Sequence, residues 1–257
     1  MASDDLLRTI AFEREIQARV STRMVAFAFG TAYLNDAYRV RWDSNLLWVD
    51  QAADADALVG QADRILGGAG LLHREIRVDD DETGQALADP LRARGYGGDR
   101  IVVMSLRRPT PEVTGALAEE VDFPELRPAL ETVMRREPRG ESEDTVTMLA
   151  NFRGELIRHA GARFFCARSH GEIVSMCELY MDGGVAQIED VNTLEEFRNR
   201  GLGRAVVRGA VEAARVAGAE LVFIHALEDD WPKRLYTKLG FDPIGHVWSF
   251  VKPNAGS

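Results

Sequence analysis

The chain has 257 residues, of which 46% are hydrophobic, so it can bury the core of one large or two ordinary domains. It carries 31 Lys and Arg against 41 Asp and Glu, a formal net charge of −10. This acidic balance argues against a general nucleic-acid binder, because phosphate backbones attach to broad cationic surfaces.

Neither a membrane segment nor a metal site is predicted. The sequence has no apolar run of membrane-spanning length, and its N-terminal stretch "MASDDLLRTIAFERE" is too charged for a secretory signal. We therefore expect a cytoplasmic protein without a membrane partner. Cys166 and Cys177 have no metal-ligand spacing, and we expect both to be reduced and to pack as small hydrophobic residues.

The first half of the chain alternates strand and helix patterns. The predicted elements are a strand at 46–50, a helix at 55–70, a strand at 71–79, a helix at 81–95 and strand character over 96–109. The next stretch contains Pro109 and Pro111, which predicts a linker.

The second half opens with two amphipathic helices predicted within 121–159 and then an antiparallel meander over 162–190, whose strands are joined by glycine-bearing turns. The remaining predicted elements are a strand at 185–193, a loop at 194–201, a helix at 202–218, a strand at 221–226, a short helix within 229–240 and a strand at 241–252. Asp230 is the predicted N-cap of the short helix.

The ends of the two halves resemble each other. The segments "PLRARGYGGDRIVVMSLRRP" and "LYTKLGFDPIGHVWSFVKP" align with Gly95 on Gly240 and Tyr96 on Phe241, which indicates a tandem duplication. Chance similarity of two α/β segments is the alternative. We predict an α/β (α+β) fold of two tandem modules, each with a mixed, mostly antiparallel central sheet flanked by helices.

The predicted domains are residues 1–108, a linker at 109–120, and residues 121–257. The first half has no glycine-rich loop after its strand at 46–50, and Leu91 stands at the position that matches Tyr236. We therefore expect the first domain to lack catalytic motifs and the second to carry the site.

The loop before the predicted helix at 202–218 has the form Arg-x-x-Gly-x-Gly. Backbone N–H groups at a helix N-terminus attract anions, and Gly201 and Gly203 allow positive φ and a close approach of the ligand. Asn199 tolerates the left-handed region better than most residues. Phosphate oxygens can also accept charge-assisted hydrogen bonds from Arg198, Arg200 and Arg204.

This loop predicts a compact anion site in an acidic protein. It is not a mononucleotide P-loop, because no Gly-Lys-Ser/Thr follows, and it lacks the third glycine of a dinucleotide fingerprint. A solvated helix face is the alternative explanation for Arg204 and Arg208.

The order strand, "RNRGLG", helix, strand and "RLYTKLGF" resembles the GNAT superfamily of acyl-CoA-dependent N-acyltransferases. The resemblance covers residues 121–252, with the first half as a degenerate copy, and tandem GNAT proteins with one silent half are known. It implies an N-acetyltransferase that transfers the acetyl group of acetyl-CoA, its co-substrate, to a primary amine by direct attack.

The resemblance also implies how acetyl-CoA is held. Backbone groups of Val191 and Thr193 would pair with the pantetheine arm. The pyrophosphate would be held by Arg198, Arg200, Gly201, Leu202, Gly203 and Arg204. The family often has Asn where Asp229 stands, so Asp229 occupies a further cofactor-contact position.

Two catalytic positions follow from the same resemblance. Tyr236 matches the tyrosine that protonates the leaving thiolate. Glu189 is four residues before Thr193 and is expected on the same strand face, where the family often places a carboxylate acting through water. Asp190, expected on the opposite face, His225 and water itself remain alternatives for the general base.

The acceptor is expected to be a small-molecule or side-chain amine. It would be cationic if the acidic residues near the site face the cleft: Glu189, Asp190, Glu195, Glu196, Glu228, Asp229 and Asp230. Ordinary solvated loops are the alternative explanation of these residues. A non-catalytic acyl-CoA-binding or regulatory module is the alternative function. The sequence leaves the acyl chain length and the formation of a homodimer open.

Overall fold

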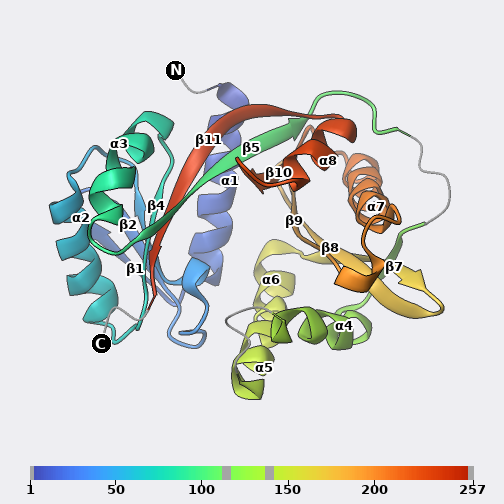
Figure 1. Cartoon of the computed structure of the whole chain (residues 1–257), viewed down its shortest axis with the longest axis horizontal. Helices are drawn as coiled ribbons and strands as arrows, with labels where there is room; N and C mark the ends of the chain where they lie inside the picture. Colours follow the sequence, from blue (N-terminus) through green and yellow to red (C-terminus); the bar gives the residue numbers. More distant parts are fainter. Residues whose placement is uncertain (1–2, 112–116, 137–141, 254–257) are drawn as a thin grey trace. The chain divides into compact units, whose positions relative to one another are not determined.

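The computed structural model describes residues 3–111, 117–136 and 142–253 (Figure 1). Within these residues the chain divides into two compact units. Unit 1 comprises Met1–Val103, Ala226–Asp230 and Ile244–Ser257, and unit 2 comprises Met104–His225 and Trp231–Pro243. The predicted domain boundaries stay a prediction, and part of the predicted linker, 112–116, lies outside the described residues.

Unit 1 contains α1 (Asp4–Val20), α2 (Ala55–Ala62) with a π-helical continuation (Asp63–Gly67), α3 (Asp81–Arg92), β1 (Arg23–Phe27), β2 (Gly30–Leu34), β3 (Leu46–Val49), β4 (Arg74–Val78) and a 3-10 turn (Trp42–Ser44). Unit 2 contains α4 (Phe123–Arg135), α5 (Glu143–Asn151), α6 (Arg153–Ala160), α7 (Leu202–Val216), α8 (Pro232–Lys238), β6 (Glu119–Val121), β7 (Arg163–Ser169), β8 (Glu172–Asp182), β9 (Val185–Thr193) and a 3-10 turn (Glu195–Phe197). Residues of both units occur in β5 (Gly97–Leu106), β10 (Leu221–Leu227) and β11 (Phe241–Lys252).

The sheet of unit 1 is covered by helices on both faces. β1, β2 and β3 are antiparallel neighbours, β3 is parallel to β4, and the end of β11 pairs antiparallel with β4. Alternate residues of β3, Leu47 and Val49, pack with α2 and α3 through Leu58 and Leu91. Trp48 points the other way, toward α1.

The sheet of unit 2 is built in the same way. β7, β8 and β9 form the predicted antiparallel meander, and β10 is parallel to β9. Cys177 of β8 donates to the carbonyl of Val206 on α7 at 3.4 Å, whereas its neighbour Glu178 accepts from Arg153 at the start of α6. Because successive strand residues point to opposite faces, α7 and α6 cover opposite faces of this sheet.

Both units thus have the same order of elements along the chain: antiparallel strands come first, and two parallel strands joined by a helix come next. The parallel strands and their helix are β3–α2–β4 in unit 1 and β9–α7–β10 in unit 2 (Figure 1). The predicted α/β fold with central sheets flanked by helices is confirmed. The shared order supports the duplication, which stays a prediction.

Two local predictions were wrong. The described part of 121–159 forms three helices, not two, because the chain breaks at Phe152 between α5 and α6. The N-cap of α8 is Trp231 rather than Asp230, and no side chain caps that helix. No helix among the described residues has the length and apolar character needed to span a membrane.

Candidate functional site

Strand β9 contains a β-bulge. The register against β8 changes between Met176 and Glu178, and there Asp190 and Val191 of β9 together face the single residue Cys177. Asp190 adopts the left-handed region with φ 49°, which is uncommon for a residue other than glycine. After the bulge β9 pairs with β8 again, at Asn192 and Thr193, whereas its pairing with β10 extends only to Ile188.

The bulge also reverses the alternation of side chains along β9. Glu189 is opposite Glu178, whereas Thr193 is opposite Ser175, and these two β8 residues point to opposite faces. The hydroxyl oxygens of Thr193 and Ser175 are 2.8 Å apart, which fixes this register. The predicted common face of Glu189 and Thr193 is therefore wrong, because the inserted residue shifts the alternation by one.

The loop before α7 has the predicted backbone. Gly201 is the N-cap with φ 79° and ψ 2°, and Asn199 has φ 63°. Gly203 lies within the helix without a positive φ, so of the two glycines only Gly201 has the predicted left-handed conformation. A Cβ at Gly203 would lie 3.3 Å from the hydroxyl oxygen of Thr193, so glycine there allows β9 and α7 to come close.

Among the residues that the structure describes, no side chain caps the first turn of α7. Other helices of this chain are capped by Ser3, Asp54, Asp80 and Ser142. A Cβ built on Gly201 would meet nothing within 4 Å. The N-terminus of α7 therefore presents backbone N–H groups and the positive end of the helix dipole to open space, which suits an anion.

The loop arginines are bonded to backbone carbonyls rather than carboxylates. Arg198 donates to the carbonyl of Thr193 at 3.3 Å, and Arg200 donates to the carbonyl of Glu196 at 3.0 Å. The carboxylate of Glu196 instead accepts from both terminal nitrogens of Arg136, at 2.9 and 3.1 Å, and this holds the pKa of Glu196 at about 2. The charges of the loop arginines are thus not neutralised by the nearby acidic residue.

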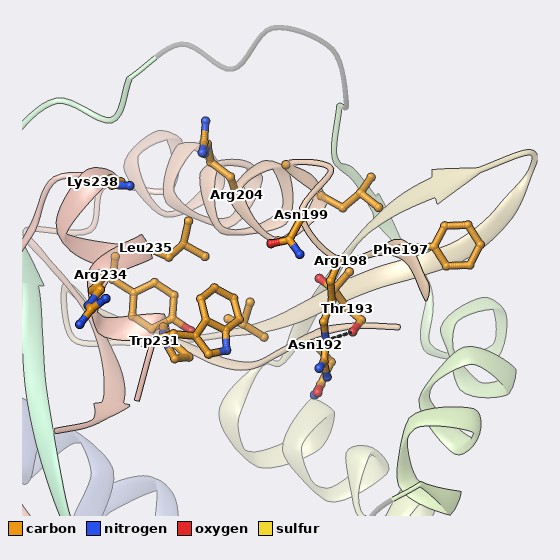
Figure 2. Close-up of a pocket in the computed structure, with 16 residues that line it drawn as sticks. Asn192, Thr193, Phe197, Arg198, Asn199, Arg204, Trp231, Arg234, Leu235 and Lys238 are labelled. Carbon is orange, nitrogen blue, oxygen red and sulfur yellow. Dashed lines mark hydrogen bonds between the residues drawn. The ribbon is translucent and has the colours of Figure 1, made fainter. Parts of the chain in front are cut away.

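These elements enclose a cavity of about 680 Å³. Figure 2 shows α8 side chains along one side of it and those of β9 and the loop along the other, with Arg204 at the α7 end. The lining residues are Val191, Asn192, Thr193, Phe197, Arg198, Asn199, Gly201, Leu202, Gly203, Arg204, Trp231, Pro232, Arg234, Leu235, Tyr236 and Lys238. Of the predicted cofactor contacts, Arg200 and Asp229 are not part of this lining.

The lining is cationic. Arg204, Arg234 and Lys238 are exposed, and none forms an ion pair with a described residue. Elsewhere in unit 2 carboxylates pair with Arg108, Arg127, Arg135, Arg136, Arg153, Arg158, Arg163 and Arg168. In a chain with excess acid, positive charges left open around one cavity indicate a polyanionic ligand.

Arg234 and Lys238 were not recognised in the sequence. They are four residues apart on α8 and therefore lie on one side of it. This spacing was the signal that could have identified them.

Two aromatic residues of the α8 segment line the cavity. Tyr236 is only 5% exposed, and its ring packs edge-on against Phe241 with centroids 6.3 Å apart. Trp231, at the start of the helix, is 60% exposed and lies at the cavity (Figure 2). The tyrosine therefore contributes a small, buried part of the cavity wall, whereas the tryptophan contributes a large part that is exposed to solvent.

The three candidate bases have different surroundings. Glu189 is half-buried, and its Oε1 accepts from Gln187 at 2.5 Å and lies 3.8 Å from Nδ1 of His225 on the neighbouring strand β10. Asp190 forms an ion pair with Arg153. The structure thus brings Glu189 and His225 together, while Asp190 is engaged by an arginine.

Comparison with known proteins connects this site to a family. Residues 126–241, which contain the bulge, the loop, α7 and α8, match the sequence model of the acetyltransferase (GNAT) family. Over 73 residues the chain is 33% identical to an uncharacterized N-acetyltransferase of Chlorobaculum tepidum, covering 28% of this chain and 47% of that protein. The chain thus spans about half the length of this relative.

Solved structures share the fold. A GCN5-related N-acetyltransferase from Kribbella flavida superposes with a TM-score of 0.66 at 20% identity, covering 99% of this chain and 97% of that one. A tandem GNAT protein from the clavulanic acid biosynthesis pathway gives a TM-score of 0.57 at 16% identity, covering 89% and 80%. The family match over residues 126–241 confirms the resemblance inferred from the loop and α8, and the solved structures show that the chain shares their fold.

Proposed function

We propose that the chain is an N-acetyltransferase that transfers the acetyl group of acetyl-CoA to a primary amine. The observation that carries this proposal is the N-terminus of α7, which no described side chain caps, at a cavity with three cations that form no ion pair with a described residue. A diphosphate suits such a place, because backbone N–H groups, the helix dipole and arginine side chains all favour negative charge. The open space at Gly201 leaves room for it.

The residues that would hold acetyl-CoA follow from the cavity. Backbone groups of Val191 and Thr193, at and after the bulge, would pair with the pantetheine arm. The diphosphate would be bound by Arg198, Gly201, Leu202, Gly203 and Arg204. The proposal does not extend to Arg200 and Asp229, because they lie outside the lining.

The chemistry requires a thioester, which acetyl-CoA supplies, and a neutral amine. As the amine nitrogen bonds to the acetyl carbon, the carbon–sulfur bond breaks and its electron pair goes to sulfur. Tyr236 is proposed to give its phenolic proton to that sulfur, since a phenol with an ordinary pKa of ~10 holds its proton at neutral pH. The nitrogen, positively charged after the attack, gives up one proton to form the amide, and through water this proton restores the phenol of Tyr236. Its place in the wall of the cavity supports this role.

Glu189 is proposed to accept the proton that the ammonium group loses. Because it is not part of the cavity lining, the proton would pass through water, and His225 lies close enough to share the charge. Asp190 is a weaker choice, since its carboxylate is bound by Arg153.

The acceptor is proposed only as a primary amine. Two of the acidic residues expected to attract a cationic acceptor, Asp190 and Glu196, are paired with arginines. No carboxylate is among the residues that line the cavity. Preference for a cationic amine therefore has no support from the lining.

Two measurements test the function. Acetyl-CoA at millimolar concentration should raise the thermal unfolding temperature, because a ligand of the folded state stabilises it by mass action. In a thiol-release assay with a panel of amines, at least one amine should release free CoA faster than buffer alone. No thermal protection would refute the proposal, and protection without thiol release to any amine would favour the non-catalytic acyl-CoA-binding module.

A further inference from the structure

A buried charged network lies behind the bulge of β9, on the face covered by α6. The side chains of Arg153 and Glu178 are 4% and 2% exposed, and Nε of Arg153 donates to Oε1 of Glu178 at 2.7 Å. Arg153 also donates to the carbonyl of Leu149 at 3.3 Å and to the carboxylate of Asp190. Tyr180 donates its hydroxyl proton to the second oxygen of Glu178.

Burial and charge act against each other in this network: burial raises the pKa of Glu178 above its usual value, although the charge of Arg153 opposes the shift. Burial alone would lower the pKa of Arg153, but the carboxylates of Glu178 and Asp190 raise it above its usual value. Burial raises the pKa of Tyr180 well above 10.0, so the phenol keeps the proton that it donates. One arginine therefore joins two carboxylates from neighbouring strands.

Stability alone is a weak reason for such a network. Replacing a buried ion pair by apolar residues of similar volume is often neutral or stabilising, because desolvation offsets the attraction between the charges. A buried arginine is better explained by the geometry that it imposes. Here it imposes the position of Asp190.

Asp190 is the left-handed residue of the bulge, a conformation that residues other than glycine adopt only occasionally. Three contacts hold it and its neighbours: the ion pair with Arg153, a hydrogen bond from the Asn192 amide to the Asp190 carbonyl at 3.2 Å, and one from the Ser175 hydroxyl to the Asn192 carbonyl at 2.9 Å. The residues that follow Asp190 on β9, from Val191 to Thr193, line the cavity.

We propose that Arg153 and Asp190 are positioning residues: their ion pair fixes the bulge so that the backbone after Asp190 faces the cavity and can bind the pantetheine arm of the acyl donor. This inference rests on the proposed function. It assigns Asp190 a role that excludes service as the general base, because its carboxylate stays bound to the guanidinium of Arg153.

The test compares CoA with adenosine 3′-phosphate 5′-diphosphate, which carries the diphosphate but no pantetheine. The variant is Asp190→Asn, because Asn also tolerates the left-handed region and Arg153 keeps its pair with Glu178. Calorimetry should show that CoA affinity falls by about 10-fold or more, whereas the fragment binds within about 2-fold of the unchanged protein.

A matched control removes a carboxylate elsewhere in unit 2. Glu120 is 47% exposed, close to the 41% of Asp190, and pairs with Arg163 at 2.7 Å. Glu120→Gln should leave both affinities unchanged, because β6 does not line the cavity.

The outcomes distinguish a failure of the proposed function from a failure of the positioning role of Arg153 and Asp190. If the unchanged protein binds neither ligand, the proposed function fails and the inference with it. If the unchanged protein binds both, but Asp190→Asn binds CoA as tightly or loses both ligands equally, only the inference fails. A loss of kcat with unaltered CoA affinity would make Asp190 the base and would also overturn it.

Discussion

At the scale of single residues, Tyr236 offers the sharpest test of the chemistry. Tyr236→Phe removes the phenolic proton and keeps the buried ring against Phe241. We expect kcat to fall by about 10-fold or more while the affinity for acetyl-CoA stays nearly constant, since general acids typically contribute at least that much. Steady-state kinetics and calorimetry measure the two quantities separately.

Tyr96 supplies a matched control. It is 2% exposed, and its hydroxyl has no hydrogen-bond partner among the described residues. Burial raises its pKa to about 12. Tyr96→Phe should therefore leave kcat unchanged. Equal turnover in the Tyr236 and Tyr96 variants would remove Tyr236 from the mechanism.

Glu189 can be tested through the pH dependence of the rate. A general base acts in its deprotonated form, so the rate falls as pH drops below the pKa of the base. Glu189→Gln should lower the rate at neutral pH by about 10-fold or more and remove the acidic limb of the profile. The readout is kcat/KM across the pH range at saturating acetyl-CoA.

His225 is the comparison for that experiment, because its Nδ1 lies 3.8 Å from Glu189. His225→Gln should shift the acidic limb but keep it. If the limb disappears in the His225 variant and persists in Glu189→Gln, the histidine is the base.

At the scale of elements, the two ends of α7 provide a matched pair of glycines. Gly201 before the helix has φ 79° and Gly218 after it has φ 83°, and a Cβ would meet nothing within 4 Å at either. Alanine at each position should destabilise the protein by about 1 kcal/mol through the left-handed conformation. Only Gly201→Ala should weaken acetyl-CoA binding, by about 10-fold, because its methyl group enters the anion site.

Denaturant unfolding and calorimetry on both variants check this prediction. The unfolding free energies should match, and the affinities should differ. An unchanged affinity in Gly201→Ala would move the diphosphate away from this helix end.

The features of α7 could be predicted because their causes are local in sequence. A glycine and an asparagine before an apolar helix pattern sufficed to predict left-handed residues at Gly201 and Asn199, and the start of the helix at Leu202. The family motif in α8 was likewise contained in a few residues. Both parts of the site could therefore be recognised without a structure.

The bulge in β9 could not be predicted in this way. A single inserted residue leaves the composition of the strand unchanged, so the period-two rule placed Glu189 and Thr193 on one face. Asp190 is held by Arg153, 37 residues earlier on another element, and only the fold brings the two together. A contact between residues so far apart in the sequence leaves no periodic pattern from which it could be predicted.

At the scale of the whole molecule, the distribution of charge is the informative feature. The chain has a net charge of −10, and most arginines of unit 2 are paired with carboxylates. Arg204, Arg234 and Lys238 of the cavity lining form no ion pair with a described residue, and the lining, as far as the structure describes it, contains no carboxylate. An anionic ligand thus meets an attractive field only near its site, and exposed charges of this kind are screened by salt.

The affinity for CoA should therefore fall as ionic strength rises, and Arg204 should carry part of that dependence. Arg204 and Arg215 are both exposed on α7 and form no ion pair with a described residue, but only Arg204 lines the cavity. Arg204→Gln should weaken CoA binding by about 10-fold at low salt, the effect of one charge-assisted hydrogen bond, and flatten the salt dependence. Arg215→Gln should change neither. Calorimetric titrations between low and high salt decide between them: equal behaviour of the two variants would mean that the field of the whole chain, rather than the cations at the cavity, governs binding.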